Sequence, residues 1–195
     1  MSNSQSHRNC SGTAGENTHC CPPRFAACES AEADLHPAAG AAILQCGEVV
    51  DPLKIPANFT GLQTLAAVEI DATCLCYPHV KIEFSTLIDI VIPTTATSGV
   101  QGKLDIQLSR TCNGGLKKTL QSYTINVATP GAGGTITIPW SFIFCEDDLK
   151  SKKCIYSVDI LKNTLSDGAA TPTGVDATFN STDIAAFAVG GARIC

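Results

Sequence analysis

Residues 80–92 have the sequence VKIEFSTLIDIVI, in which apolar and polar side chains alternate. The apolar side chains share one parity: Val80, Ile82, Phe84, Ile88, Ile90 and Ile92. The other parity carries Lys81, Glu83, Ser85 and Asp89. Because successive side chains of a strand point to opposite faces, this period of two predicts a β-strand with one buried face. The alternation is interrupted at Thr86 and Leu87, where we expect the strand to bend.

The same alternation recurs further along the chain. Residues 103–109 place Leu104, Ile106 and Leu108 between polar side chains, and residues 135–144 repeat the pattern around Trp140, the only tryptophan. Pro139 cannot donate a ladder hydrogen bond, so we expect its strand to lie at a sheet edge or to carry a bulge. Weaker strand patterns cover residues 41–46, 64–71, 120–128, 154–165 and 177–189.

These segments are separated by stretches rich in Gly, Pro and Asn, which are typical of turns. About eight short strands and no helix of normal length predict an all-β protein with a two-sheet antiparallel β-sandwich, specifically an eight-stranded jelly roll. Residues 1–40 show no apolar periodicity. We therefore predict a flexible, cysteine-bearing N-terminal connector over residues 1–40 and a β-sandwich domain over residues 41–195.

Composition argues against several classes of partner. The net charge of −5 is mild, and the 13 Lys and Arg residues are not gathered into a patch of the kind that binds phosphates. We expect no nucleic-acid partner. No stretch approaches the ~20 apolar residues of a membrane-spanning helix, so we expect no membrane span. The first eight residues lack an apolar segment and are not recognisable as a signal peptide.

The chain has 11 cysteines: Cys10, Cys20, Cys21, Cys28, Cys46, Cys74, Cys76, Cys112, Cys145, Cys154 and Cys195. Under oxidising conditions an odd number leaves at least one thiol free or bonded to another chain. Since cytosolic thiols are kept reduced, we expect a protein that is made inside a cell and oxidised later on a spore or cell surface. Adjacent cysteines rarely bond to each other without strain, so Cys20 and Cys21 are each expected to find a different partner.

Several of the domain's cysteines lie at predicted strand ends, which gather at the rims of a sandwich. Cys145 and Cys154 bracket a loop of acidic and then basic residues. A disulfide closing that loop would contribute about 2 to 3 kcal/mol in the chain-entropy model.

Metal-binding and catalytic patterns are weak. Structural zinc sites usually contain paired C-x2-4-C knuckles, whereas Cys74 and Cys76 are one residue apart. No G-x-S-x-G elbow stands between a strand and a helix, and His79 only begins the most regular strand. We therefore expect no metal, no cofactor and no catalytic residue, and we expect that the protein is not an enzyme.

Five segments carry a resemblance to a known family: Ile43–Gly47, Val68–Cys76, Lys81–Ser85, Phe142–Asp147 and Cys154–Val158. Through them, residues 43–195 resemble a family of uncharacterised, cysteine-rich domains known mainly from anaerobic spore-forming bacteria. That family implies no function. The layout is also similar, more loosely, to the pilin subunits of bacterial endospore appendages, which are jelly-roll domains preceded by a flexible connector with a Cys-Cys pair.

The second resemblance implies roles for the cysteines. In such fibres the connector bonds covalently to cysteines on the strands of other subunits, while sheet edges pair side by side. Cys20 and Cys21 match the connector pair, Cys28 is a further candidate and Cys46 is a plausible acceptor. The full set of interchain candidates is Cys10, Cys20, Cys21, Cys28, Cys46 and Cys195. The intradomain candidates are Cys74, Cys76, Cys112, Cys145 and Cys154.

The sequence therefore favours a structural subunit that self-assembles into a disulfide-cross-linked extracellular fibre, a spore appendage or pilus-like filament. Its expected partners are copies of itself in a helical homopolymer, together with a second related subunit or a spore or cell-surface anchor. Two alternatives stay open. One is a carbohydrate- or surface-binding β-sandwich module such as an adhesin, and the other is a spore-coat component that does not form filaments.

Overall fold

The structure is a computed structural model, and it describes residues 42–73, 75, 78–96, 99–131, 133–147, 149–150, 153–169 and 171–190. Its strands are β1 (Ala42–Cys46), β2 (Glu48–Val49), β3 (Leu53–Ile55), β4 (Thr60–Asp71), β5 (Pro78–Ile92), β6 (Gln101–Cys112), β7 (Lys118–Ala128), β8 (Gly134–Glu146), β9 (Lys153–Asn163) and β10 (Ala177–Gly190). The predicted connector lies outside the described residues, so the division of the chain near residue 40 stays a prediction.

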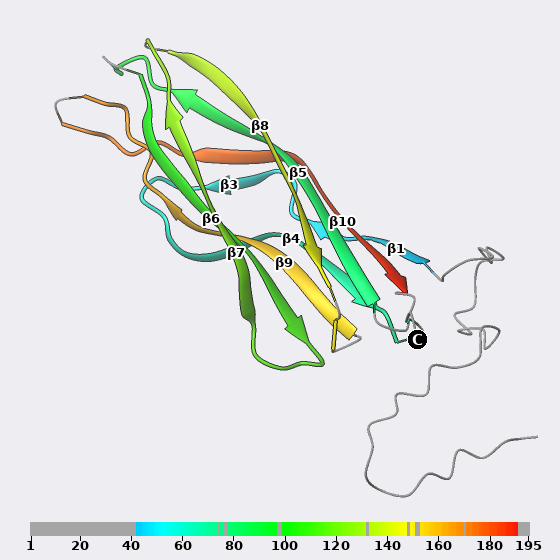
Figure 1. Cartoon of the computed structure of the whole chain (residues 1–195). Helices are drawn as coiled ribbons and strands as arrows, with labels where there is room; N and C mark the ends of the chain where they lie inside the picture. The colour runs from blue at the N-terminus through cyan, green and yellow to red at the C-terminus, as the bar shows by residue number, and fades with distance from the viewer. Residues whose placement is uncertain are drawn as a thin grey trace, which may run out of the picture. The chain divides into compact units, whose positions relative to one another are not determined.

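The strands form two antiparallel sheets (Figure 1). Sheet A has the order β1-β10-β5-β8, with β3 also pairing with β10, and sheet B has the order β2-β4-β9-β6-β7. When the short strands β2 and β3 are left out, eight strands remain and can be numbered one to eight along the chain. In these numbers sheet A has the order 1-8-3-6 and sheet B has the order 2-7-4-5. This is the strand order of a jelly roll.

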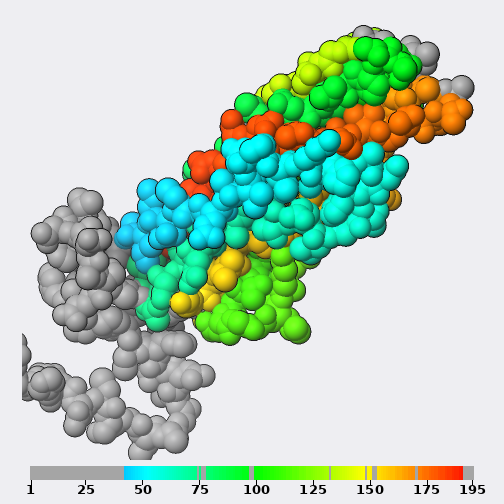
Figure 2. Space-filling model, turned by 180° about the vertical axis from the view of Figure 1, so that it is seen from behind, coloured from blue at the N-terminus to red at the C-terminus, as the bar shows by residue number. Residues whose placement is uncertain are grey.

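The predicted fold class is therefore confirmed, but the predicted number of strands is wrong. The described residues form ten strands rather than eight, because β2 and β3 also pair. These two strands hold two and three residues, which is too short for an alternation of polarity to show. Their neighbours β4 and β10 position them, and Figure 2 shows the cyan segment that contains β3 against the orange-red β10.

Strand β5 keeps its period of two over its whole length, including the predicted point of bending. Thr86 is buried and Leu87 is exposed, so both follow the parity of their neighbours. The irregularity lies on β10 instead, where the register shifts between Asn180 and Asp183. The hydroxyl of Thr86 lies 3.0 Å from that of Thr182, so a bulge on the neighbouring strand supplies the buried threonine with a partner.

Strand β8 lies at an edge of sheet A among the described strands, as Pro139 predicted. Its pairing with β5 runs without a register shift from Gly134 to Glu146, so no bulge is needed. Trp140 is half-buried. Its ring packs edge-on against Phe84 and Tyr123, with ring centres 5.6 and 5.5 Å apart, in an aromatic cluster between the two sheets.

The core fills the space between the sheets, and Gly47 marks where the chain crosses from one sheet to the other. The Gly47 N–H donates to the carbonyl oxygen of Ile184 at 2.8 Å. A Cβ atom at this position would lie 2.3 Å from the backbone oxygen of Ala67 and 2.4 Å from Cγ2 of Ile184. Only glycine fits, which places the end of β1, and with it Cys46, firmly against the sandwich.

Candidate assembly surface

The four described cysteines fall into two kinds. Cys112 and Cys154 are bonded to each other, whereas Cys46 and Cys145 are exposed and unbonded in the part of the chain that the structure describes. The other candidates lie outside the described residues: Cys10, Cys20, Cys21, Cys28, Cys74, Cys76 and Cys195. Among the predicted interchain cysteines, Cys46 is thus the one whose surroundings are known.

The Cys112–Cys154 bond joins two directly opposed residues of neighbouring strands, β6 and β9, with their Cα atoms 4.1 Å apart. Both side chains face the core, and Cys154 is fully buried. Both belong to the predicted intradomain set. The hypothesis that Cys145 closes the loop to Cys154 is wrong, because Cys154 is bonded to Cys112 and Cys145 lies on the opposite sheet.

Beside this disulfide, one carboxylate links the two sheets. Glu146 on β8 accepts a hydrogen bond from the Tyr156 hydroxyl at 2.9 Å and forms an ion pair with Arg110 on β6. Tyr156 is completely buried. Burial raises the pKa of the Tyr156 hydroxyl well above its ordinary value, and the neighbouring charge of Glu146 raises it further. The cluster holds the end of β8, and therefore Cys145, in a fixed position.

The raised pKa of Tyr156 predicts a loss of stability in alkali. In the unfolded chain tyrosine has a pKa near 10 and releases its proton above that pH, whereas the folded protein keeps the proton on Tyr156. The contribution of Tyr156 to the free energy of unfolding is therefore present below pH 10 and declines as the pH rises beyond it. We expect the free energy of unfolding to fall between about pH 10 and 12, measured by urea denaturation. The Tyr156→Phe variant should show a shallower decline over the same range. Parallel declines would contradict the assignment.

Cys46 and Cys145 lie on the same face of sheet A, the outer one, at its two edges. Cys46 ends β1 and lies opposite Ala185, whereas Cys145 near the end of β8 lies opposite Lys81. Followed across the sheet, their rows are neighbours: Cys46–Ala185–Glu83–Ile143 and Leu44–Phe187–Lys81–Cys145. Three strand spacings of about 4.8 Å lie between the two residues across the sheet, and one two-residue step of about 7 Å lies between them along the strands. The Cα atoms of Cys46 and Cys145 are therefore roughly 16 Å apart.

This face carries several large apolar side chains that are exposed. Of its large apolar side chains, Leu44 is 68% exposed, Ile143 63% and Phe187 40%. They surround an ion pair between Lys81 and Glu83. Large apolar side chains exposed together on one face are typical of sites of interaction with other proteins.

Both edges of sheet A are open to pairing among the described strands. Strand β8 carries no charged side chain from Gly134 to Cys145, and β1 carries none at all. Soluble proteins usually protect edge strands with charged side chains, especially Lys, or with Pro. Pro139 is the one such device on β8. The two edges that bear the exposed thiols thus have little of this protection against pairing with another chain.

Other kinds of site are not apparent where the structure is described. No group of three or more His, Cys, Asp and Glu side chains that could hold a metal is found among the described residues. His79 is exposed and its Nδ1 lies 2.9 Å from the carboxylate of Asp147, also exposed. No helix in the described ranges is long and apolar enough to cross a membrane.

Comparisons with known proteins add a family and distant structural likenesses. A family model described as "Domain of unknown function (DUF4489)" matches residues 40–189. No curated protein matches. Among solved structures, a chain from the structure of the infectious bursal disease virus Gx strain is similar to this one. The alignment covers 80% of this chain and 33% of the viral chain, at 11% identity and a TM-score of 0.42. Eiger TNF from S. frugiperda aligns with 78% of this chain and 93% of its own, at 11% identity and a TM-score of 0.37. This chain spans about a third of the viral chain.

Proposed function

The chain belongs to the DUF4489 family of domains of unknown function, and we propose that it is a non-enzymatic structural subunit. In this proposal the subunit assembles with copies of itself into a disulfide-cross-linked extracellular fibre, such as a spore appendage or a pilus-like filament. The likeness to endospore appendage pilins supports the proposal through its layout of a connector with paired cysteines before a jelly roll.

The observation that carries the proposal is the placement of the two exposed thiols. Cys46 and Cys145 lie on one face, at opposite edges of one sheet. The connector brings two more thiols, Cys20 and Cys21, whose adjacency gives each a different partner. Each copy thus supplies two connector thiols, here called donors, and two thiols on sheet A, here called acceptors, for disulfide bonds between copies. The sequence alone groups Cys145 with the intradomain cysteines, and we reassign it here to the interchain acceptors.

Such bonding leads to an open polymer. Donors on the connector and acceptors on sheet A are different surfaces of the chain, so the contact between copies is heterologous and generates a helical filament unless the rotation closes a ring. The sparsely charged edges β1 and β8 supply unpaired backbone groups for contacts between neighbouring copies. Oxidation after release from the reducing cytoplasm then fixes the contacts covalently. A second related subunit or a spore or cell-surface anchor would attach the fibre.

The test is gel electrophoresis of the protein with and without reductant, together with negative-stain electron microscopy. We expect a ladder, or material too large to enter the gel, that collapses to the 20.3 kDa subunit on full reduction. The Cys20→Ser, Cys21→Ser variant should lose most of the ladder, and so should Cys46→Ser, Cys145→Ser. Ser11→Ala, Thr13→Ala, which changes two connector residues but leaves every cysteine in place, is the control and should keep the ladder.

A soluble monomer under both conditions would contradict the proposal. It would favour the alternative of a carbohydrate- or surface-binding module. Cross-linked material without filaments in the micrographs would instead favour the spore-coat component.

A further inference from the structure

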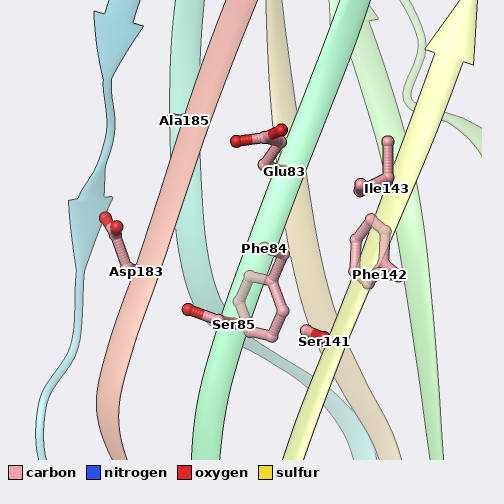
Figure 3. A pocket seen from close by; sticks show the side chains of 8 residues that line it. All are labelled: Glu83, Phe84, Ser85, Ser141, Phe142, Ile143, Asp183 and Ala185. Atoms are coloured by element: carbon pink, nitrogen blue, oxygen red, sulfur yellow. The ribbon is translucent and has the colours of Figure 1, made fainter.

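A groove crosses the outer face of sheet A beside the exposed apolar side chains described above. Ser85 lies opposite Ser141 on one side and Asp183 on the other, so short side chains form one row across three strands. Two hollows of about 320 and 430 Å³ both include Ser85 and Ser141 in their linings. Figure 3 shows the first hollow, with Ser85 on β5 between Asp183 on β10 and Ser141 on β8. We call this row the Ser85 groove.

The groove runs beside one of the exposed thiols. The next row along the strands is the one that ends in Cys46, since Ala185, two residues after Asp183, lies opposite Cys46. Two residues advance a strand by about 7 Å, and neighbouring strands lie about 4.8 Å apart, so the Cα atoms of Asp183 and Cys46 are about 8 Å apart. A chain lying in the groove passes next to the Cys46 thiol.

The groove also offers one uncompensated negative charge. Asp183 is exposed, and its carboxylate has no hydrogen bond or ion pair with any described residue. The other carboxylate at the rim, that of Glu83, is already paired with Lys81. A ligand for this groove should therefore bring a single cation to Asp183.

The connector has such a cation at a matching distance from a cysteine. Residues 19–25 have the sequence HCCPPRF, in which Pro22 and Pro23 separate Cys21 from Arg24. Consecutive prolines favour the polyproline II conformation, which advances about 3.1 Å per residue, so the Cα atoms of Cys21 and Arg24 would lie about 9 Å apart. This spacing matches that of Cys46 and Asp183.

The connector is also long enough to reach another molecule. Sixteen residues separate Phe25 from Ala42, where β1 begins. When extended, they span up to about 55 Å. Residues 19–25 can therefore lie on a neighbouring copy rather than on their own domain.

We propose that the Ser85 groove holds residues 19–25 of a second copy, with Arg24 of that copy paired to Asp183 and its Cys21 bonded to Cys46. The inference rests on the proposed function and specifies where the connector lies. The ion pair forms first and holds the two thiols together. The Cys21 and Cys46 thiols then lose two protons and two electrons as the S–S bond forms, and a small-molecule disulfide such as oxidised glutathione takes up the electrons and protons and becomes two thiols.

The test follows bond formation in the full-length protein under limiting oxidised glutathione. A mixture of copies labelled with nitrogen-14 and nitrogen-15 is digested, and mass spectrometry quantifies the Cys21–Cys46 peptide of mixed label. We expect Asp183→Asn and Arg24→Gln each to slow its formation about three- to tenfold at low salt, and high salt to reduce the difference. Asp105→Asn is the matched control, because it makes the same change to a carboxylate on β6 of the other sheet, and its rate should equal that of the wild type.

A charge exchange tests the pairing between copies. When Arg24→Asp copies are mixed with Asp183→Arg copies, the mixed-label bond should recover between the connector of the first variant and the sheet of the second. Either variant alone should stay slow, because its connector and its groove carry charges of the same sign.

Four outcomes decide the matter. An unchanged rate in Asp183→Asn, or no recovery in the mixture, would overturn the groove as the docking site even if the wild type still forms a ladder. A Cys21–Cys46 peptide found only with a single label would show that the connector binds its own domain, which also overturns the inference. Absence of any ladder in the wild type would reject the proposed function itself.

Discussion

Replacing Cys112 and Cys154 together by alanine is expected to lower the free energy of unfolding by about 4 kcal/mol. The bond joins residues separated by 42 positions, and the chain-entropy model assigns about 4 kcal/mol to closing a loop of that length in the unfolded state. For a domain of this size, a change of about 4 kcal/mol corresponds to a fall in melting temperature of about 8 to 16 °C.

The measurement is urea denaturation of the full-length protein after alkylation of its free thiols, which prevents cross-linking between copies. The matched control is the Cys46→Ser, Cys145→Ser variant. It also removes two sulfurs, but from exposed positions, so its stability should lie within about 0.5 kcal/mol of the wild type. Equal stability of the two double variants would contradict the role of the Cys112–Cys154 bond.

The second large effect is expected at Glu146, which serves two partners on the opposite sheet. In the Glu146→Ala variant the Tyr156 hydroxyl is left buried without its acceptor, and Arg110 loses its ion pair. Breaking a buried pair costs about 3 to 5 kcal/mol. Since the side chains of Arg110 and Glu146 are 17% and 20% exposed, water offsets part of that loss, and we expect about 3 kcal/mol.

The control for this prediction is another Glu paired with a basic residue. Glu69 lies 2.9 Å from the ammonium group of Lys153, but both side chains are at least half exposed. Glu69→Ala should therefore cost less than about 1 kcal/mol. Tyr156→Phe, which removes only the hydroxyl, should cost about 1 kcal/mol near neutral pH. If urea denaturation gave the same loss for Glu146→Ala and Glu69→Ala, the link between the sheets would be unimportant.

The long strands were predictable because each buries one face. The alternation of apolar and polar side chains in residues 80–92 and 135–144 reflects the burial of one strand face. Pro139 correctly indicated an edge strand. The short strands β2 and β3 show no such alternation in the sequence. Thr86 was misleading since its polarity suggested a bend, whereas its hydroxyl is buried against a bulge on β10.

The partners of the cysteines were harder to predict because they depend on strand order. Cys112 bonds to Cys154 since β6 and β9 are neighbours in sheet B, although β7 and β8 separate them in the sequence. Proximity along the chain suggested Cys145 instead, which belongs to the other sheet. The Ser85 groove was invisible for the same reason, because its row joins residues from three strands. Sequence patterns indicate which face a residue occupies, and only the register determines its neighbours.

The burial of one disulfide and the exposure of the remaining described thiols have a consequence for turnover. A reductant in the surrounding medium reaches Cys46 and Cys145 directly, whereas in the Cys112–Cys154 bond Cys154 is buried and Cys112 is partly buried against the core. Bonds made at the surface would therefore open while the domain stays folded. A fibre built in this way could be dismantled by a mild thiol into intact subunits that are ready to polymerise again, so that its lifetime is set by the redox state of its surroundings rather than by the stability of the domain.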